Sequence, residues 1–351
     1  MKRIKLTALL SIIIVLNSCS NDDDHKLPKG DYEKGYFITN EGPFQNGSGT
    51  ITFIGDDGVK SQNIYKTVNN EDLGNIVSSM TLTDESAYVI VNNSNKIVVT
   101  NRYTMKSITV IEGDNIKLPK YMAVNKDTGY VSNWGDPYNS EDDFIAIIDL
   151  NTNTISGKIP VGEGPENLKI VDNKLFVTLE GGFSQNNQVV VINTNNNTVE
   201  ANLTIGDVPN SIVSDENGNV WVLCQGNPSY ATTETRGSLY KIKVSDLEIT
   251  NFDFDAITDH PTSLVVDANE LYYNLNGKVY VFDVKSSNLP TESIVGLDGY
   301  YYAMKTNNGE LYATDAKDYA SEGELIIFDL ASNTLVETVT TGIIPGDIVF
   351  Q

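Results

Sequence analysis

The sequence predicts an all-β fold, a seven-bladed β-propeller with four short strands in each blade. An opening phrase recurs at a spacing of about 42 to 52 residues, the length typical of propeller repeats. Each copy is followed by three more apolar stretches separated by polar turns. No stretch keeps the 3.6-residue period of an amphipathic helix. Regular short strands in units of this length favour a propeller over a sandwich or a helical solenoid.

The first strand of each unit is marked by the opening phrase, a Gly-containing or polar turn followed by Pro, two residues and an aliphatic side chain. Copies of the phrase lie at 118–122, 162–168, 206–212 and 259–264. Val77 and Tyr301 take the place of the Pro in two further units. These positions give six units.

The second and third strands follow at fixed distances. A large side chain opens the second strand, and these residues are Tyr88, Tyr130, Phe176, Trp221, Tyr272 and Tyr312. An apolar run that ends in Asp or Asn forms the third strand, as at 145–149 and 189–193. An Asn- and Thr-rich turn, as at 151–155, then leads into a fourth strand.

The seventh blade is predicted to be split between the two ends of the domain. Residues 36–42 match 175–181, so the domain begins with a second strand. Residues 342–350 have the pattern of a first strand with no second strand after it. We therefore expect the C-terminal strand to complete the N-terminal blade, so that residues 35–351 form one closed ring without open sheet edges between its ends.

These repeats resemble a known family. The Gly-x-x-Pro opening, the aromatic-Val second strand and the Val-Ile-Asp third strand are similar to YVTN-type β-propeller repeats, from Gly35 to Gln351. The resemblance implies the fold and leaves the activity open, because propellers carry many unrelated functions.

The N-terminus has the pattern of a lipoprotein signal peptide, which we assign to residues 1–18. Basic residues precede an apolar run at 6–16 that is too short for a stop-transfer helix. The sequence Leu-Asn-Ser-Cys at 16–19 resembles a lipobox and implies lipidation of Cys19. The alternative is a plain secreted protein with a chance Cys.

Residues 19–34 are expected to form a lipidated, acidic and flexible tether. The Ser-Asn-Asp-Asp-Asp run at 20–24 resembles the export signal that sends lipoproteins to the cell surface in some Gram-negative bacteria. A solvated linker is the alternative. The sequence thus predicts an outer-membrane, lipid-anchored and surface-exposed protein.

The charge balance excludes one class of partner. The chain has 24 basic and 47 acidic residues; removal of Lys2, Arg3 and Lys5 with the signal peptide leaves 21 against 47, a net charge of −26. Such a surface repels nucleic acid and anionic headgroups. With Cys19 lipidated, Cys224 is the one remaining Cys, and its apolar surroundings predict a buried, inert side chain.

One face of the propeller is predicted to bind a ligand. The second-to-third-strand loops and the connections between blades share this variable face, whereas short, uniform Asn/Asp/Gly turns occupy the opposite face. Exposed aromatic residues in polar loops are typical of recognition surfaces. The predicted ligand-binding residues are Phe44, Trp134, Tyr138, Phe183, Tyr230, Arg236, His260, Tyr300 and Tyr319. Leu297 and Tyr301 are assigned to the same exposed connections. The alternative for each ring is a lid folded back onto its own blade.

The sequence contains no recognisable set of residues for catalysis, metal binding or cofactor binding. One of the two His residues, His25, lies in the tether, and no nucleophile triad or phosphate loop is present. His260 is interpreted as structural more readily than as a ligand contact. Acidic residues crowd 136–143 and could hold Ca²⁺, although a solvated turn is favoured. We expect a protein that is not an enzyme and needs no cofactor.

The leading hypothesis is capture of a small molecule for uptake through a TonB-dependent transporter. The signal peptide, acidic run and repeats resemble surface propeller lipoproteins that are extracellular cobalamin-binding partners of such transporters. This resemblance implies a ligand such as a corrinoid. One alternative is a protein- or glycan-binding adhesive module. A lactonase-like or quinone-dependent propeller enzyme is the third, and would need a metal or acid–base group at the axis.

Overall fold

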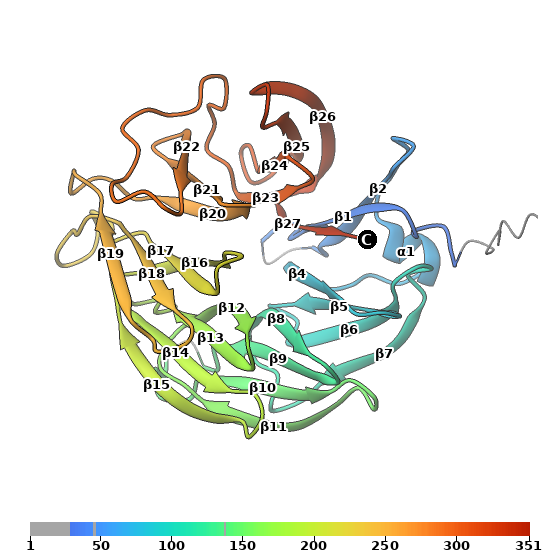
Figure 1. Ribbon diagram of the computed structural model, residues 1–351. Coiled ribbons are helices and arrows are strands. Elements are labelled where there is room, and N and C mark those ends of the chain that lie inside the picture. The colour runs from blue at the N-terminus through green and yellow to red at the C-terminus, as the bar shows by residue number, and fades with distance from the viewer. Residues whose placement is uncertain (1–28, 45–46, 137) are drawn as a thin grey trace, which may run out of the picture.

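The computed structural model describes residues 29–44, 47–136 and 138–351, which form a ring of seven antiparallel sheets around a central axis (Figure 1). The prediction of an all-β, seven-bladed propeller is confirmed. The signal peptide, Cys19, the acidic run and His25 lie outside the described residues.

The blades are numbered 1 to 7 along the chain, and their strands are given from the axis outward. Blade 1 consists of β27 (Pro345–Phe350), β1 (Gly35–Asn40), β2 (Thr50–Gly55) and β3 (Lys60–Ser61). Blade 2 consists of β4 (Val77–Leu82), β5 (Ser86–Val91), β6 (Lys96–Asn101) and β7 (Ser107–Glu112). Blade 3 consists of β8 (Pro119–Asn125), β9 (Thr128–Asn133), β10 (Phe144–Asp149) and β11 (Thr154–Pro160). Blade 4 consists of β12 (Pro165–Val171), β13 (Lys174–Leu179), β14 (Gln188–Asn193) and β15 (Thr198–Thr204).

The remaining blades follow the same order. Blade 5 consists of β16 (Pro209–Ser214), β17 (Asn219–Cys224), β18 (Ser238–Lys243) and β19 (Ile249–Asp253). Blade 6 consists of β20 (Thr262–Asp267), β21 (Glu270–Leu275) and β22 (Lys278–Asp283). Blade 7 consists of β23 (Ala303–Asn307), β24 (Glu310–Asp315), β25 (Glu322–Asp329) and β26 (Thr334–Ile343).

The C-terminal strand closes the ring as the sequence predicts. Strand β27 pairs antiparallel with β1, with Tyr36 opposite Phe350 and Thr39 opposite Asp347, so the first and last strands lie side by side in blade 1 (Figure 1). The Tyr312 ring of blade 7 packs 4.9 Å from the Phe350 ring, measured between centroids. Closure therefore joins the first and last blades through hydrogen bonds and through packed rings.

Blade 6 departs from the four-strand pattern, because the chain after β22 does not form an outer strand. The residues from 284 to 302, all of them described, touch β22 through one bridge between Lys278 and Asp298 and through the Ile294 N–H, which donates to the Val279 carbonyl at 2.8 Å. Most of this segment is exposed, but it buries Leu297 (0% exposed) and Tyr301 (7% exposed) in the apolar core. The expectation that these two side chains lie exposed on the variable face is wrong.

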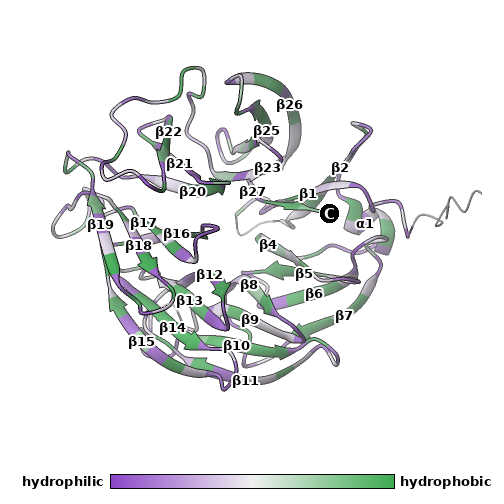
Figure 2. Cartoon of the chain, in the orientation of Figure 1, coloured by the Kyte–Doolittle hydropathy of each residue, from purple (hydrophilic) through white to green (hydrophobic). Residues whose placement is uncertain are grey.

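The core lies between neighbouring blades. The large side chains that open the second strands are all buried, and these are Tyr88, Tyr130, Phe176, Trp221, Tyr272 and Tyr312. Apolar residues run along the strands and polar residues gather in the turns (Figure 2). Cys224 is completely buried, as predicted, and this burial raises the pKa of its thiol.

A recurring turn opens five of the blades. The residue before the first strand has a positive φ of 43° to 71° in each case; these residues are Ile76, Leu118, Gly164, Val208 and Ile344. A left-handed backbone is strained for side chains such as Ile and Val. The carbonyl of each turn residue accepts a hydrogen bond from the residue that follows the second strand of the same blade, namely Asn92, Trp134, Glu180, Gln225 and Glu41. The turn thereby fixes the positions of the side chains around the axis.

The one helix in the described part of the chain, α1 (Ile64–Asn69), packs beside β2 through the buried Ile64 and Tyr65. At six residues it is far too short to cross a bilayer, and none of the described residues form a membrane-spanning helix.

Candidate functional site

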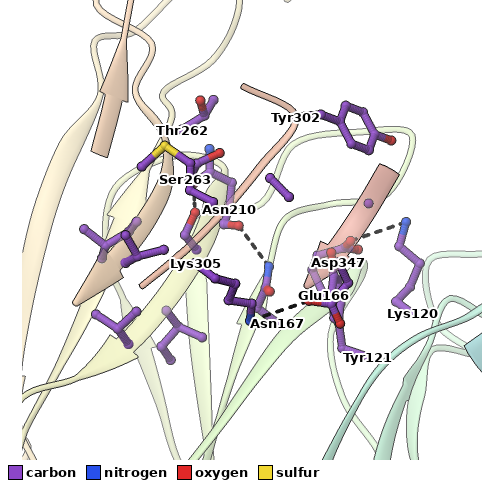
Figure 3. A pocket seen from close by; sticks show the side chains of 18 of the residues that line it. Lys120, Tyr121, Glu166, Asn167, Asn210, Thr262, Ser263, Tyr302, Lys305 and Asp347 are labelled. Atoms are coloured by element: carbon purple, nitrogen blue, oxygen red, sulfur yellow. Dashed lines mark hydrogen bonds and ion pairs between the residues drawn. The ribbon is translucent and has the colours of Figure 1, made fainter. Parts of the chain in front are cut away.

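A cavity of about 570 Å³ lies on the axis between the first strands of the blades (Figure 3). The residue directly after the opening Pro, or after its substitute, lines this cavity in every blade. We call these seven residues the mouth ring: Ser78, Lys120, Glu166, Asn210, Thr262, Tyr302 and Gly346. First strands begin at the variable face, so the mouth ring lies at the end of the cavity that opens toward the predicted binding face.

Residues that follow the second strands add a further set of polar groups. Glu41, Glu180 and Gln225 line the same cavity. Glu41 and Glu180 occupy the same position of the repeat, because each follows the second strand and donates its backbone N–H to the turn carbonyl of its blade. The mouth of the cavity therefore combines the carboxylates of Glu41, Glu166 and Glu180 with the single ammonium group of Lys120.

Lys120 supplies the positive charge among these side chains. Its Nζ lies 3.3 Å from Glu166 Oε1 and 4.1 Å from the centre of the Trp134 ring. The second carboxylate oxygen of Glu166, Oε2, is buried and has no hydrogen-bond partner among the described residues, and Glu166 is only 7% exposed. Removal from water raises the pKa of Glu166, although Lys120 opposes this effect.

Burial raises the pKa of the other two carboxyl groups as well. Burial, followed by the charge of Glu166, raises the pKa of Glu180 to about 7. Burial raises the pKa of Glu41 as well, although the Tyr302 hydroxyl donates to Glu41 Oε1 at 2.8 Å. Among the described residues, the mouth thus holds three carboxyl groups and one lysine, Lys120.

Further along the inner strands, a second ion pair and two amide bridges connect the blades. Lys305 Nζ lies 3.6 Å from Asp347 Oδ1, and Asp347 also accepts a hydrogen bond from the Met80 N–H at 3.3 Å. Asn167 Nδ2 donates to the Asn210 carbonyl at 2.9 Å (Figure 3), and Asn210 Nδ2 donates to the Pro261 carbonyl at 3.1 Å. These bonds hold adjacent inner strands in fixed positions.

A second cavity of about 620 Å³ adjoins the first and shares Thr262, Ser263 and Tyr302 with it. Two predicted binding residues, Tyr300 and Tyr319, line this second cavity. Tyr300 is 81% exposed, and the Tyr302 and Tyr319 rings meet edge-to-face at 6.0 Å. The two cavities together form one recess under an aromatic rim.

The structure brings three more predicted residues together on the other side of Lys120. Phe183 lies 6.1 Å from the Trp134 ring and 6.3 Å from the Tyr138 ring, to which it is nearly parallel. Trp134 is half-buried and its Nε1 donates to the Pro165 carbonyl, whereas Tyr138 is 95% exposed. We call Trp134, Tyr138 and Phe183 the aromatic cluster.

The other predicted residues do not line either cavity. Phe44 and Tyr230 stand exposed on separate loops. Arg236 pairs with Asp253 at 3.4 Å, N to O. His260 is half-buried, with Nδ1 3.0 Å from the Gln225 carbonyl and Nε2 3.2 Å from Glu234 Oε1. These contacts give His260 a role in holding two loops together.

The acidic loop at 136–143 uses its carboxylates internally. Asp142 accepts from the Asp136 N–H at 3.1 Å, and Asp143 Oδ2 accepts from the Gly164 N–H at 2.6 Å. Among the residues that the structure describes, no group of three or more His, Cys, Asp or Glu side chains is arranged to hold a metal ion.

Sequence reasoning missed the mouth ring, although the repeat contains its signal. The position after the Pro carries Lys120, Glu166 and Asn210 in three successive units, in contrast to the uniform Pro beside it. A polar residue that varies at a fixed repeat position, next to a turn that sets the backbone, marks a side chain directed to the axis.

Asp143 is expected to make stability depend on pH. Burial raises the pKa of Asp143 to about 7, above its ordinary value, so the folded protein binds the proton more tightly than the unfolded chain. This contribution to stability is complete only below about pH 4, the pKa range of the unfolded carboxyl, decreases as the pH rises, and is lost above about pH 7. The free energy of unfolding should decrease between pH 4 and 8 by up to about 4 kcal/mol less in Asp143→Asn than in the parent protein. Urea unfolding at a series of pH values would measure this difference.

Glu141→Gln, in the same loop, provides the control because the Glu141 side chain is exposed. An Asp143→Asn variant whose stability falls with pH as steeply as that of the parent would contradict this assignment.

Comparison with known proteins agrees with the class that the fold defines, a β-propeller. Residues 34–341 match the family described as "Domain of unknown function (DUF5074)". The chain belongs to this family. No curated protein sequence matches it.

Solved structures share the fold at low sequence identity. A quinonprotein alcohol dehydrogenase-like protein from Bacteroides thetaiotaomicron matches with a TM-score of 0.65 and 15% identity, over 91% of this chain and 78% of that chain. The periplasmic gluconolactonase PpgL of Pseudomonas aeruginosa matches with a TM-score of 0.63 and 12% identity, over 90% and 99% of the two chains. AztD of Citrobacter koseri matches with a TM-score of 0.54 and 12% identity, over 90% and 96%. These likenesses establish the propeller fold and carry no activity to this chain.

Proposed function

We propose that this protein is a non-enzymatic binding protein that holds a small molecule in the recess of the variable face. The observation that carries the proposal is the pair of adjoining cavities, about 570 and 620 Å³, under exposed tyrosines. Sites for small molecules are typically recesses of about 300 to 1,000 Å³ with aromatic walls and a few placed polar groups. Tyr300, Tyr319 and the mouth ring supply those two kinds of group.

The exposed rings support binding for a second reason. Tyr138, Tyr230 and Tyr300 are 95%, 85% and 81% exposed, so they leave large apolar surfaces in water. Exposed apolar area costs roughly 25 cal/mol per Å², which a bound partner would recover. All three side chains lie on the variable face.

Delivery to a transporter is the second part of the proposal. The predicted lipidation of Cys19 and the acidic run at 20–24 would hold the domain at the outer surface of an outer membrane. A recess displayed there suits capture of a ligand for a TonB-dependent transporter. The resemblance to cobalamin-binding surface propellers favours a corrinoid as the cargo.

Calorimetry against cobalamin, haem and glycans tests the ligand and the site together. Tyr300→Ala and Tyr319→Ala each remove contact area from the rim without touching an inner strand. Each should weaken binding by about 2 kcal/mol, roughly thirty-fold. Val59→Ala and Glu216→Ala, on exposed turns of the opposite face, are the controls and should leave affinity unchanged. Unchanged affinity in both tyrosine variants would place the site elsewhere.

Glycan or protein binding by the aromatic cluster is a second candidate, and one observation favours it. The cavity beside the cluster measures only about 10 Å³, so Tyr138 and Phe183 present nearly flat, exposed faces. Flat aromatic patches suit extended partners. Tyr138→Ala and Phe183→Ala would then abolish glycan binding while Tyr300→Ala has no effect, the reverse of the pattern expected for the recess.

Surface display is tested separately at Cys19. A clickable palmitate analogue should label the wild type and not Cys19→Ala, because the thiol is the expected acylation site. Protease added to intact cells should then degrade the labelled protein. Full protection from protease, with digestion only after lysis, would rule out the surface location.

A further inference from the structure

We propose that the mouth of the axial cavity binds a positively charged nitrogen group of the ligand, an organic ammonium or guanidinium, with Glu166 as the principal acceptor and Glu41 and Glu180 beside it. This inference rests on the proposed function and names the chemical class of the group that enters the recess. It is carried by an orphaned buried oxygen and by an imbalance of charge at the mouth.

The orphaned oxygen is Glu166 Oε2. The other oxygen of this carboxylate, Oε1, faces Lys120 Nζ at 3.3 Å, while Oε2 is buried without a hydrogen-bond partner in the described part of the chain. A buried carboxylate oxygen left without a donor is costly. Glu166 lines the cavity, but Oε2 itself is closed to solvent, so a donor in the cavity reaches this oxygen once the carboxylate turns toward it.

The charges at the mouth of the cavity favour a donor that is positively charged. The groups at the mouth that act on Glu166 are Glu41, Glu180, Lys120, the buried Tyr121 and the Trp134 indole N–H, while the Tyr302 hydroxyl donates to Glu41. Three carboxyls thus surround one ammonium group. An arriving cation restores the balance, whereas an arriving carboxylate would meet three carboxyls of its own sign.

The charged groups further along the axis do not change the ratio of three carboxyls to one lysine at the mouth. Asp347 and Lys305 form their own pair, with Nζ and Oδ1 3.6 Å apart. Lys169, whose pKa burial and the charge of Lys305 lower, adds a further positive group on that side. The two lysines on that side therefore outnumber Asp347 by one, and the excess of carboxyls is confined to the mouth, where three face Lys120.

The aromatic walls favour the same class of group. Trp134 already holds the Lys120 ammonium 4.1 Å from its ring centre, and Tyr302 and Tyr319 stand at the adjoining recess. Aromatic faces attract ammonium and guanidinium groups. Carboxylates with aromatic rings bind organic cations, whereas Mg²⁺ and Ca²⁺ prefer a shell of oxygens.

Titration of the purified protein with 1,4-diaminobutane, 1,4-butanediol and succinate tests the proposal. The three probes share one carbon chain and differ in charge. At pH 7 and about 150 mM salt, which screens the acidic outer surface, the diamine should bind at least about tenfold more tightly than the diol. Succinate should not bind. Equal binding of diamine and diol, or preferred binding of succinate, Mg²⁺ or Ca²⁺, would overturn the proposal.

Variants locate the site. Glu166→Gln should weaken diamine binding about tenfold or more, and Glu180→Gln, which is less buried, should act in the same direction if Glu166→Gln folds poorly. Lys120→Met keeps an unbranched side chain over the Trp134 ring and removes the Lys120 ammonium group, which competes with the diamine for Glu166. This variant should therefore bind the diamine several-fold more tightly. Glu248→Gln on an exposed turn is the matched control. Equal affinity in all four variants would mean that the diamine binds the outer surface, against the proposal.

Proton release provides a readout that surface binding would not give. With the pKa of Glu180 at about 7, a cation that binds beside this carboxyl should displace protons near pH 6.5. Calorimetry in two buffers of different ionisation enthalpy should show this release in the wild type and less of it in Glu180→Gln. Binding with no proton release at pH 6.5 would count against the site.

The two proposals can fail independently. If cobalamin, haem or a glycan binds through Tyr300 and Tyr319 while the diamine shows no preference over the diol, the cation subsite is wrong and the recess stands. If the diamine binds through Glu166 and no tyrosine variant affects any ligand, the rim has been placed wrongly.

Discussion

Deletion of residues 342–351 should lower the free energy of unfolding by about 5 kcal/mol or more, or prevent folding. The deletion removes β27, whose Ile348 is buried against Ile38 and Tyr312, and exposes the edge of β1. It also removes Asp347 and so leaves Lys305 without its partner. Urea unfolding followed by circular dichroism and by tryptophan fluorescence would measure the loss.

A matched control lies on the outermost strand of blade 7. Leu335→Ser and Val336→Ser change exposed side chains of β26 and should alter stability by less than about 0.5 kcal/mol each. A truncated protein that unfolds as cooperatively as the full chain, at the same urea concentration, would show that blade 1 does not need β27.

Trp221→Ala should cost about 3 to 5 kcal/mol, the usual loss when a fully buried indole is truncated. Trp221 is completely buried between blades 5 and 6, 5.6 Å from the Phe282 ring. Its Nε1 donates to Asp215 Oδ2 at 2.8 Å. The substitution therefore opens a cavity and also removes a donor from a buried carboxylate.

Trp221→Phe reduces the packing loss, because a six-membered aromatic ring stays in the site while the indole N–H donor is lost. Burial would raise the pKa of Asp215, but hydrogen bonds from Trp221 and Asn219 lower it below its ordinary value. The bonded carboxylate therefore stabilises the fold above the unfolded pKa, and this contribution is lost as the pH falls. Trp221→Phe should cost about 1 to 3 kcal/mol at pH 7 and less near pH 3. A cost that is equal at both pH values would assign the whole effect to packing.

The number of blades and the closure of the ring could be predicted from the sequence because each blade is assembled from neighbouring strands. The features that mark a blade are local in the sequence. They are a turn, the two-residue alternation of side chains along a strand, and an aromatic side chain such as Phe176 or Trp221. Closure could be predicted for the same reason, because residues 36–42 and 342–350 each match one part of a complete unit.

Blade 6 could not be predicted in the same way. The sequence after β22 has neither an alternating pattern nor the Asn- and Thr-rich turn of the other blades. Its pattern therefore predicts an exposed connection. Packing against the core decided instead that Leu297 and Tyr301 lie inside. Burial of such a segment depends on the space that neighbouring blades leave for it.

The loops and rings of the variable face follow from the sequence, because loop length and composition are local and the topology of a blade fixes which loops share a face. Which rings meet was decided only by tertiary structure. Tyr300 and Tyr319 join at one recess, Trp134, Tyr138 and Phe183 form a cluster, and Phe44 and Tyr230 stand apart.

The cavity at the axis belongs to the tertiary structure alone. Lys120 and Glu166 lie in consecutive blades and become partners only when two inner strands are set side by side around the axis. Glu41 and Glu180 belong to blades 1 and 4 and face the same space because the ring closes. The sequence by itself determined each side chain and its place in the repeat. Burial and the charges across the axis, which set the pKa of each carboxyl, exist only after seven blades have enclosed a common centre.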